Sequence, residues 1–215
     1  MTETVLVFGA SGNIGVAAII GALNAKRHVI AVVRNQASAE KILKYVECRD
    51  GITIVEADIT SEDSVRGVVD KVRNGSLPSF QHVWASLAYR ATVPYLLEKG
   101  FPGSTWTMCT GGQGDMGYRV APAVTQGALF SFAIAAAREN EKTNIRFNEV
   151  YLVYRVQFEV DKGSQTFAGL EMTTSKSFAP LYEKLLHRTD IRSSRVKVLS
   201  PQDVVELSYM KNYKD

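Results

Sequence analysis

Three glycines near the amino terminus, Gly9, Gly12 and Gly15, have the spacing that a dinucleotide phosphate site requires. In such a site the first glycine permits a tight bend, the second lets the backbone approach the pyrophosphate, and the third lets a helix pack against a strand. A helix that begins near Asn13 would direct unpaired N–H groups and its positive dipole end at the phosphates. The alternative is a domain that keeps the turn and binds nothing. We predict a pyrophosphate site with contacts from Gly9, Ser11, Gly12, Asn13, Ile14 and Gly15.

Residues that follow the next predicted strands indicate which nucleotide is bound. Arg34 ends the β-branched run 28–33, where an NAD site usually has an acid, and an arginine there suits a 2′-phosphate. Asp58, with Ile59 beside it, follows the third strand, where its carboxylate could accept a hydrogen bond from the adenine amino group. Ser86 follows the fourth strand and is a further candidate contact. We therefore predict NADP(H) as the cofactor; the alternatives are a solvated Arg34 and an Asp58 that caps local backbone.

Alternating strands and helices must position these residues. The glycine turn lies between an apolar strand and an apolar helix, and the same alternation continues along the chain. It gives a doubly wound parallel sheet with helices on both faces, a Rossmann-like α/β fold. Thr60 and Asp63 are expected to form a capping box. The expected strands are 5–8, 28–33, 52–56, 82–87, 105–109 and 145–153, and the expected helices are 13–25, 38–46, a helix ending near 73, a short helix before 105, and 124–139.

The carboxyl-terminal third has less regular patterning. Residues 157–194 are polar and poorly periodic, and we expect a loop-and-helix segment that caps the substrate side of the sheet. Ser200, Pro201 and Asp203 indicate another helix start. The chain stops soon afterwards, so we expect the usual last strand to be missing. Without repeats or linkers, residues 1–215 are expected to form a single domain.

Composition excludes several classes of protein. The chain has 215 residues, 46% hydrophobic and 22% charged, with 25 basic against 22 acidic residues. The scattered basic residues argue against a nucleic-acid partner, and no apolar stretch approaches the ~20 residues that span a bilayer. Without a leader pattern we expect a cytoplasmic protein. Two distant cysteines and dispersed histidines argue against disulfides and a metal site. A homodimer is one assembly open to such a chain.

The pattern resembles the short-chain dehydrogenase/reductase superfamily over nearly the whole chain. Beyond the glycine turn and Asp58, the resemblance is carried by the strand before Tyr89 and by three motifs: Gln126-Gly127-Ala128-Leu129, Asn144-Ile145-Arg146-Phe147-Asn148 and Leu199-Ser200-Pro201-Gln202-Asp203-Val204-Val205. The three-residue glycine spacing is closer to the atypical and extended branches than to the standard one. The resemblance implies the Rossmann fold, a nicotinamide cofactor and oxidoreductase chemistry.

The catalytic positions depart from the family pattern. Aligning the Gly-Ala-Leu of the long helix places Gln126 at the family's Lys position, Pro122 at its Tyr position, and Cys109-Thr110 at its Ser position. Proline has no ionisable group, and glutamine has no charge that would stabilise a phenolate. The standard Tyr/Lys proton relay is therefore expected to be absent. Thr110 could still polarise a carbonyl, or it could be an ordinary hydroxyl at the end of a strand.

Two further departures bear on the site. Tyr89 stands where the family has a glycine, so its ring would occupy the cofactor contact, and Leu152-Val153 replaces the usual Pro-Gly. The glycine-rich loop 110–119 could swing Tyr118 into the vacated donor position; the alternative is an exposed aromatic. Side chains after the sixth strand reach the same edge: Tyr151, Tyr154 and Arg155.

Three functions remain open at this point. The first is an NADP(H)-dependent reductase of small-molecule, including secondary, metabolism with relocated catalytic groups. The second is a non-redox isomerase, cyclase or dehydratase on the same scaffold, and the third is a non-catalytic protein that senses NADP(H). A small organic substrate would fit an apolar pocket that we expect to be lined by Trp84, Leu87, Tyr89 and Trp106.

Overall fold

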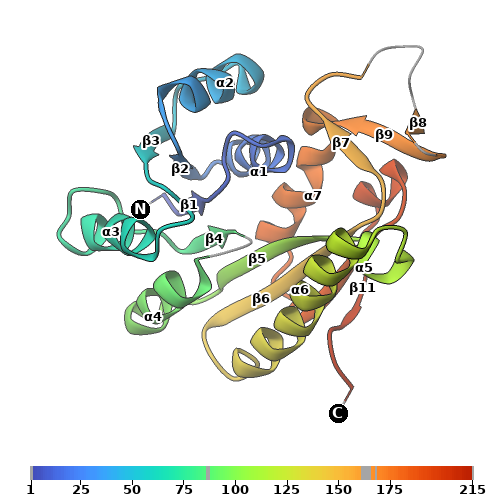
Figure 1. Ribbon diagram of the computed structural model, residues 1–215. Helices are drawn as coiled ribbons and strands as arrows, with labels where there is room; N and C mark the ends of the chain where they lie inside the picture. Colours follow the sequence, from blue (N-terminus) through green and yellow to red (C-terminus); the bar gives the residue numbers. More distant parts are fainter. Residues whose placement is uncertain (1, 86–87, 161–165, 168, 215) are drawn as a thin grey trace.

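A central sheet organises the protein, whose computed structural model describes residues 2–85, 88–160, 166–167 and 169–214 (Figure 1). Within these residues eight strands have the spatial order β11-β10-β6-β5-β4-β1-β2-β3. Neighbouring strands are parallel except β11, which runs antiparallel to β10. The strands are β1 (Thr4–Val7), β2 (His28–Val33), β3 (Ile52–Glu56), β4 (His82–Trp84), β5 (Ser104–Gly111), β6 (Ile145–Leu152), β10 (Ser194–Val198) and β11 (Ser208–Lys211).

Helices cover both faces of the sheet (Figure 1). One face packs against α1 (Asn13–Asn24), α2 (Gln36–Val46) and α7 (Ser175–His187). The other face packs against α3 (Glu62–Arg73), α4 (Tyr89–Lys99) and α6 (Val120–Glu139). Since every strand of the centre lies between two helical layers, its residues read as continuous apolar runs, and β1 is buried at all four positions. The predicted doubly wound fold is confirmed.

The direction of chain progression reverses at β1. Leu6 of β1 pairs with Ile30 of β2 on one side and with Val83 of β4 on the other. From this point the chain builds β2 and β3 outward in one direction, and β4, β5 and β6 in the other. Ligands of open α/β sheets bind in the crevice beyond the carboxyl ends of the strands at such a reversal. The glycine turn follows β1 directly and therefore lies at this crevice.

The prediction of a loop-and-helix cap over residues 157–194 needs correction, because α7 belongs to the core. Phe178 and Leu181 are fully buried in this helix. Gly21 of α1 allows α7 to approach closely: a Cβ atom at this position would lie 2.6 Å from the Ala179 carbonyl oxygen and 2.8 Å from Tyr182 Cβ. Polar residues on the outer side of α7 obscure its apolar stripe in the sequence. The rest of the segment contributes β8 (Thr166–Phe167) and β9 (Leu170–Thr174), which form a small sheet with β7 (Arg155–Gln157).

The expectation that the last strand is missing is wrong. β10 pairs in parallel with β6, and β11 adds an antiparallel edge strand after the Pro201 turn. β10 alternates buried and half-buried positions, with Val196 and Val198 buried, and the charged Arg195 and Lys197 between them obscure the strand in the sequence. The helix start at Ser200 yields only a single 3-10 turn, Pro201–Val204, with Ser200 and Asp203 as its capping box.

Helix α6 is long and apolar enough to cross a membrane, by length and composition only. One such helix is weak evidence, because the core helix of a globular domain passes the same test. Here α6 packs on the sheet through Phe130, Ala133 and Ala136, while Val120 and Val124 at its amino-terminal end are exposed. The prediction that the protein has no membrane partner remains untested.

Candidate functional site

The turn after β1 has the backbone geometry of a phosphate-binding loop. Gly9 has a φ of +66°, which side-chain-bearing residues rarely adopt, and its carbonyl accepts a hydrogen bond from the Gly12 N–H at 3.0 Å. α1 begins at Asn13 with Gly12 as its N-cap, and in the described structure no side chain caps it and its first turn contains no acid. The N–H groups and the positive dipole end of α1 are therefore directed at the crevice.

Close approach within the turn requires glycine at a second position. A Cβ atom at Gly15 would lie 2.3 Å from the Gly9 carbonyl oxygen and 2.8 Å from Ala10 Cα, far inside contact distance. At Gly12 the corresponding atom would lie 3.3 Å from the Gly9 oxygen, a tight contact but far milder than the overlap at Gly15. The turn thus leaves a backbone cradle that a side chain at Gly12 would fill, as a bound pyrophosphate requires. The residues present fit a dinucleotide.

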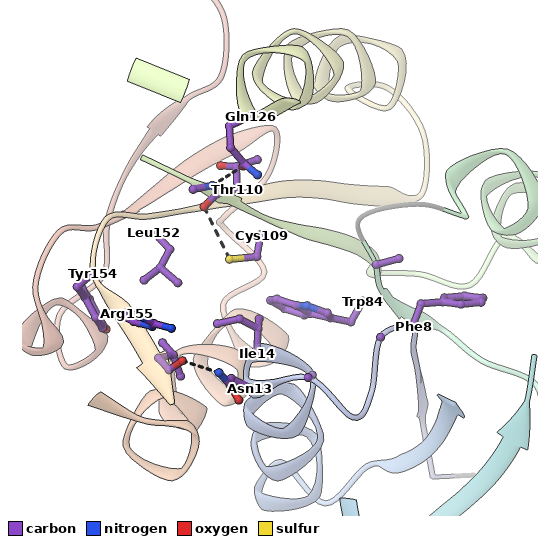
Figure 2. Close-up of a pocket in the computed structure, with 16 residues that line it drawn as sticks. Phe8, Asn13, Ile14, Trp84, Cys109, Thr110, Gln126, Leu152, Tyr154 and Arg155 are labelled. Carbon is purple, nitrogen blue, oxygen red and sulfur yellow. Dashed lines mark hydrogen bonds between the residues drawn. The ribbon is translucent and has the colours of Figure 1, made fainter. Parts of the chain in front are cut away.

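The crevice is a cleft of about 460 Å³ (Figure 2). Gly9, Gly12, Asn13 and Ile14 of the turn form one wall, and the carboxyl ends of β4, β5 and β6 form the others. In Figure 2, Trp84 and Cys109 lie between the turn and Thr110, while Leu152 and Arg155 face Ile14 across the cleft. The remaining lining residues are Phe8, Gly15, Ala85, Gly111, Gln126, Tyr154 and Val156.

A second cavity of about 330 Å³ lies on the other side of the turn and shares Gly9 with the cleft. It collects the residues predicted for the adenosine end: Ser11, Arg34, Asp58 and Ile59. Their common location agrees with the sequence-based assignment, and their contacts to a nucleotide remain a prediction. Ser86 lies outside the described residues.

Asp58 already caps local backbone. Its Oδ1 accepts hydrogen bonds from the Thr60 backbone N–H at 2.9 Å and the Thr60 hydroxyl at 2.7 Å. These two bonds, with a smaller contribution from Arg34, lower the pKa of Asp58. The predicted capping box of Thr60 and Asp63 is wrong, because α3 begins one residue later: the Ser61 side chain accepts from the Ser64 N–H at 3.2 Å.

Thr110 lines the cleft, but the residue is only 2% exposed and its hydroxyl donates to Glu149 Oε1 at 2.6 Å. Glu149 is fully buried and also accepts from Arg195 Nε at 2.9 Å. Because the Thr110 proton is donated to this ion pair, the geometry favours an ordinary strand-end hydroxyl over a group that polarises a carbonyl. Sequence reasoning missed Glu149; its signal was a single acid inside the buried run 145–152.

Most of the residues considered for catalysis have structural roles or lie outside the cleft. The Gln126 side-chain oxygen accepts from the Gly111 N–H at 2.6 Å and so ties α6 to the end of β5. Pro122 lies in the first turn of α6. Tyr118 is 77% exposed and is not among the described residues that line the cleft. Cys109 does line it, and burial raises the pKa of its thiol to about 12, so the thiol is neutral at physiological pH.

The expectation that Tyr89 and Trp106 line the pocket is wrong. α4 begins at Tyr89 and turns this ring into the opposite layer, where it packs edge-on against Trp106 and Phe132 at centroid distances of 5.3 and 5.2 Å. The Tyr89 hydroxyl donates to Glu139 at 2.9 Å. Trp106 is fully buried in the same cluster, whereas Trp84 does line the cleft. Leu87 lies outside the described residues.

A third cavity of about 310 Å³ adjoins the cleft over the ends of β5 and β6. Gly111, Leu152, Tyr154 and Arg155 line both cavities, and Gly112, Gln113 and Val153 complete the third. Burial raises the pKa of Tyr154, and its hydroxyl has no hydrogen-bond partner in the part of the chain that the structure describes. This phenol therefore stays protonated, and its oxygen is buried. Among the described residues no cluster of three metal-ligating side chains occurs.

Comparison with known proteins places this geometry in context. A curated relative from Pestalotiopsis fici, named short-chain dehydrogenase/reductase iacG, is 43% identical in an alignment that covers 97% of this chain and 96% of the relative. The NmrA-like family model matches residues 1–74, which contain the glycine turn.

Solved structures share the fold. A gluconate 5-dehydrogenase from Burkholderia cenocepacia, in complex with NADP and tartrate, superposes with a TM-score of 0.72 at 14% identity and covers 93% of this chain and 94% of its own. A putative D-mannonate oxidoreductase from Haemophilus influenza, with bound NAD, gives a TM-score of 0.74 at 11% identity, covering 94% and 95%. At these identities the likeness shows the fold alone.

Proposed function

Because the chain belongs to the short-chain dehydrogenase/reductase family, we propose that it is an NADP(H)-dependent oxidoreductase acting on a small organic molecule, with catalytic groups other than the family's standard set. A role in small-molecule, including secondary, metabolism and a cytoplasmic location are parts of the same proposal. The family assignment supports oxidoreductase chemistry in general terms. Beyond that assignment, we propose NADP(H) as the cofactor, a small organic substrate and non-standard catalytic groups.

The observation that carries the proposal is the glycine turn with a cavity on each side. Gly9 lines both the 330 Å³ cavity and the 460 Å³ cleft, so one extended ligand could cross the turn with its phosphates over the α1 amino terminus. A dinucleotide has this form: a nucleoside at each end and a pyrophosphate between. When bound, the cofactor would supply hydride-transfer capacity, and the protein would supply binding and orientation.

Arg34 supports NADP(H) over NAD(H). It lines the cavity expected to hold the adenosine end, where a guanidinium can bind a 2′-phosphate with charge-assisted hydrogen bonds. No acid takes the place of Arg34 at the end of β2, where an NAD site would use a carboxylate for the ribose hydroxyls. Asp58 lies in the same cavity, but one of its oxygens is already bonded to Thr60.

A non-redox enzyme on this scaffold is the second candidate, and one observation favours it. Three described tyrosines lie near the cleft: Tyr118 is 77% exposed, Tyr154 has a buried hydroxyl, and the Tyr151 hydroxyl is hydrogen-bonded to Asp115. None of the three therefore presents a free phenolic proton to the cleft. Proton delivery in a reductase would then need solvent or a movement of the loop that carries Tyr118. The third candidate, a protein that only senses NADP(H), would share the binding properties and lack turnover.

Calorimetric titration with NADPH and NADH tests the cofactor assignment. We expect NADPH to bind at micromolar concentrations and at least tenfold more tightly than NADH. Absence of NADPH binding at millimolar cofactor would overturn the proposal. Loss of NADPH absorbance with a panel of ketones, aldehydes and quinones then tests redox activity, whereas product formation without cofactor oxidation would favour the non-redox enzyme.

A further inference from the structure

The first residue of α1 joins this helix to the small sheet. Asn13 Nδ2 donates to the Val156 carbonyl of β7 at 2.9 Å, and the Gln157 side-chain amide lies 3.2 Å from the same nitrogen (Figure 2). The Asn13 carbonyl accepts from the Ser175 hydroxyl at 2.7 Å, and this hydroxyl also lies 3.2 Å from the Gln157 carbonyl oxygen. Ser175 is the first residue of α7 and is only 2% exposed. One junction of hydrogen bonds therefore joins the beginnings of α1 and α7 to β7.

The first turn of α1 leaves its leading N–H groups without a cap. The Gly12 carbonyl accepts from the Val16 N–H at 2.9 Å, so the N–H groups of residues 13–15 precede the first hydrogen bond of the helix. In the described structure the Gly12 N-cap has no side-chain oxygen to accept from them. Helix ends fray, and a phosphate bound at this end would supply the acceptors. A bound nucleotide would thus fix the turn that contains Asn13.

β7 depends on contacts outside its own sheet. It has three residues and lies at the edge of the small sheet, where its described strand partner is β9. Sheets of this size are marginally stable by themselves. Val156 of β7 is 5% exposed and packs in the core layer of α1 and α7, next to the bonds with Asn13 and Ser175. The placement of β7 therefore depends on the first turns of these two helices.

β7 also forms part of the ligand site. Val156 lines the 460 Å³ cleft, and Tyr154, just before β7, lines both this cleft and the 310 Å³ cavity. A movement of β7 would change the space beside the end of a bound dinucleotide. Whatever fixes β7 fixes this part of the wall.

We propose that Asn13 is a positioning residue that couples the binding of nucleotide phosphates at α1 to the placement of β7, so that the cofactor completes the wall of the substrate cavity. This inference rests on the proposed function, because the nucleotide is the anion that caps α1. The Asn13 backbone N–H serves the phosphates, and its side chain holds β7.

The coupling has a thermodynamic consequence. In the free protein β7 separates from α1 in a fraction of the molecules, as edge elements with few contacts do. Bound phosphates lower this fraction because they hold the first turn of α1 with Asn13 in its β7-bound position. By linkage, the nucleotide suppresses the separation by the same factor by which it prefers the closed form. At saturating nucleotide, that factor is measured directly by the protection of β7.

Hydrogen–deuterium exchange of the β7 and β9 amides, with and without saturating NADPH, tests the inference. We expect NADPH to slow exchange there at least fivefold in the wild type, the lower end of typical coupling between sites, and less than twofold in Asn13→Ala. Ser175→Ala, which removes the second connection, should lose part of the effect. Asn24→Ala is the matched control, because it makes the same change at the exposed last residue of α1, and it should keep the full effect.

Each variant is compared with itself, loaded against free, at an NADPH concentration well above its own dissociation constant from calorimetry. A general loss of stability changes both measurements and leaves their ratio unaltered, so a purely structural role of Asn13 would retain the protection. Unchanged β7 exchange in the wild type on NADPH binding, or full protection in Asn13→Ala, would overturn the inference. Should Asn13→Ala fail to fold, Ser175→Ala decides: protection equal to that of the wild type would overturn it.

Two further outcomes separate this inference from its alternatives. A tenfold loss of NADPH affinity in Asn13→Ala with full protection of β7 would assign the Asn13 side chain to the phosphates and would overturn the coupling. If the wild type binds no NADPH, the proposed function fails. Exchange in millimolar inorganic pyrophosphate then decides the coupling: slowed β7 exchange supports it, and unchanged exchange overturns it.

Discussion

Replacing Gly12 by alanine should abolish tight NADPH binding without unfolding the protein. Gly12 has φ −81° and ψ 165°, an extended conformation open to any L residue, and its added Cβ would lie 3.3 Å from the Gly9 carbonyl oxygen. Alanine reduces the conformational entropy of the unfolded chain, which stabilises the folded protein by about 0.4–1 kcal/mol and should offset this tight contact. The methyl group would, however, project into the space where a pyrophosphate approaches the start of α1. Losing one charge-assisted contact there costs about 1.5–3 kcal/mol, or roughly ten- to 150-fold in affinity.

Gly15→Ala is the contrasting variant. Its Cβ would lie 2.3 Å from the Gly9 oxygen and 2.8 Å from Ala10 Cα, and both are backbone atoms that cannot turn aside. Overpacking of this kind costs about 1–3 kcal/mol or more in the free energy of unfolding. Urea unfolding monitored by circular dichroism measures both stabilities, and calorimetric titration measures NADPH affinity. The reasoning fails if Gly12→Ala binds NADPH like the wild type, or if it is destabilised as much as Gly15→Ala.

Four further predictions concern single residues. Arg34→Ala should weaken NADPH binding by about 1.5–3 kcal/mol and leave NADH affinity unchanged; equal losses would assign Arg34 a structural role. Tyr118→Phe should change turnover of any substrate found by less than about twofold, because the ring is 77% exposed; complete loss of turnover would instead support a mobile-loop donor. Gly21→Ala should lower the free energy of unfolding by about 1–3 kcal/mol, measured as a lower urea midpoint, because α1 and α7 must separate. Burial lowers the pKa of His82. The hydrogen bond that Glu3 makes with His82 lowers the pKa of Glu3 to about 2. Both groups therefore bind protons more readily in the unfolded chain. Stability should therefore fall as the pH drops below 6.5 and again below 4.5, and Glu3→Gln should flatten the second decline in urea midpoints.

The first half of the fold could be predicted from sequence because each local signal there agrees with the tertiary structure. Val5–Phe8, the glycine turn and the run 28–33 lie where the pattern indicates, and strands buried on both faces leave continuous apolar runs. The turn also imposes strict steric demands at Gly9 and Gly15, so its residues identify it. In the last third, amphipathic elements such as α7 and β10 carry charged residues on one side, and short-range periodicity did not separate them from loops.

The site was predicted less completely, for a different physical reason. Which cavity a side chain lines depends on strand alternation and on where a helix begins, and both change over one residue. Tyr89 is the example: α4 begins at this residue and its ring turns into the layer opposite the cleft. The role of Gln126 as a backbone tether and the ion pair beneath Thr110 depend on contacts between elements far apart in the chain, which no local pattern encodes.

The close glycine contact between α1 and α7 limits how the protein can be re-engineered or can diverge. α1 carries the phosphate-binding end, and Gly21 on its flank fits against α7, which directly follows strand β9 of the small sheet. Exchanging the carboxyl-terminal third with that of a relative, to transplant a substrate preference, would therefore also replace the α7 surface against which α1 packs. We expect such chimaeras to need co-transfer of α1, so that substrate and cofactor modules are inherited together rather than shuffled independently.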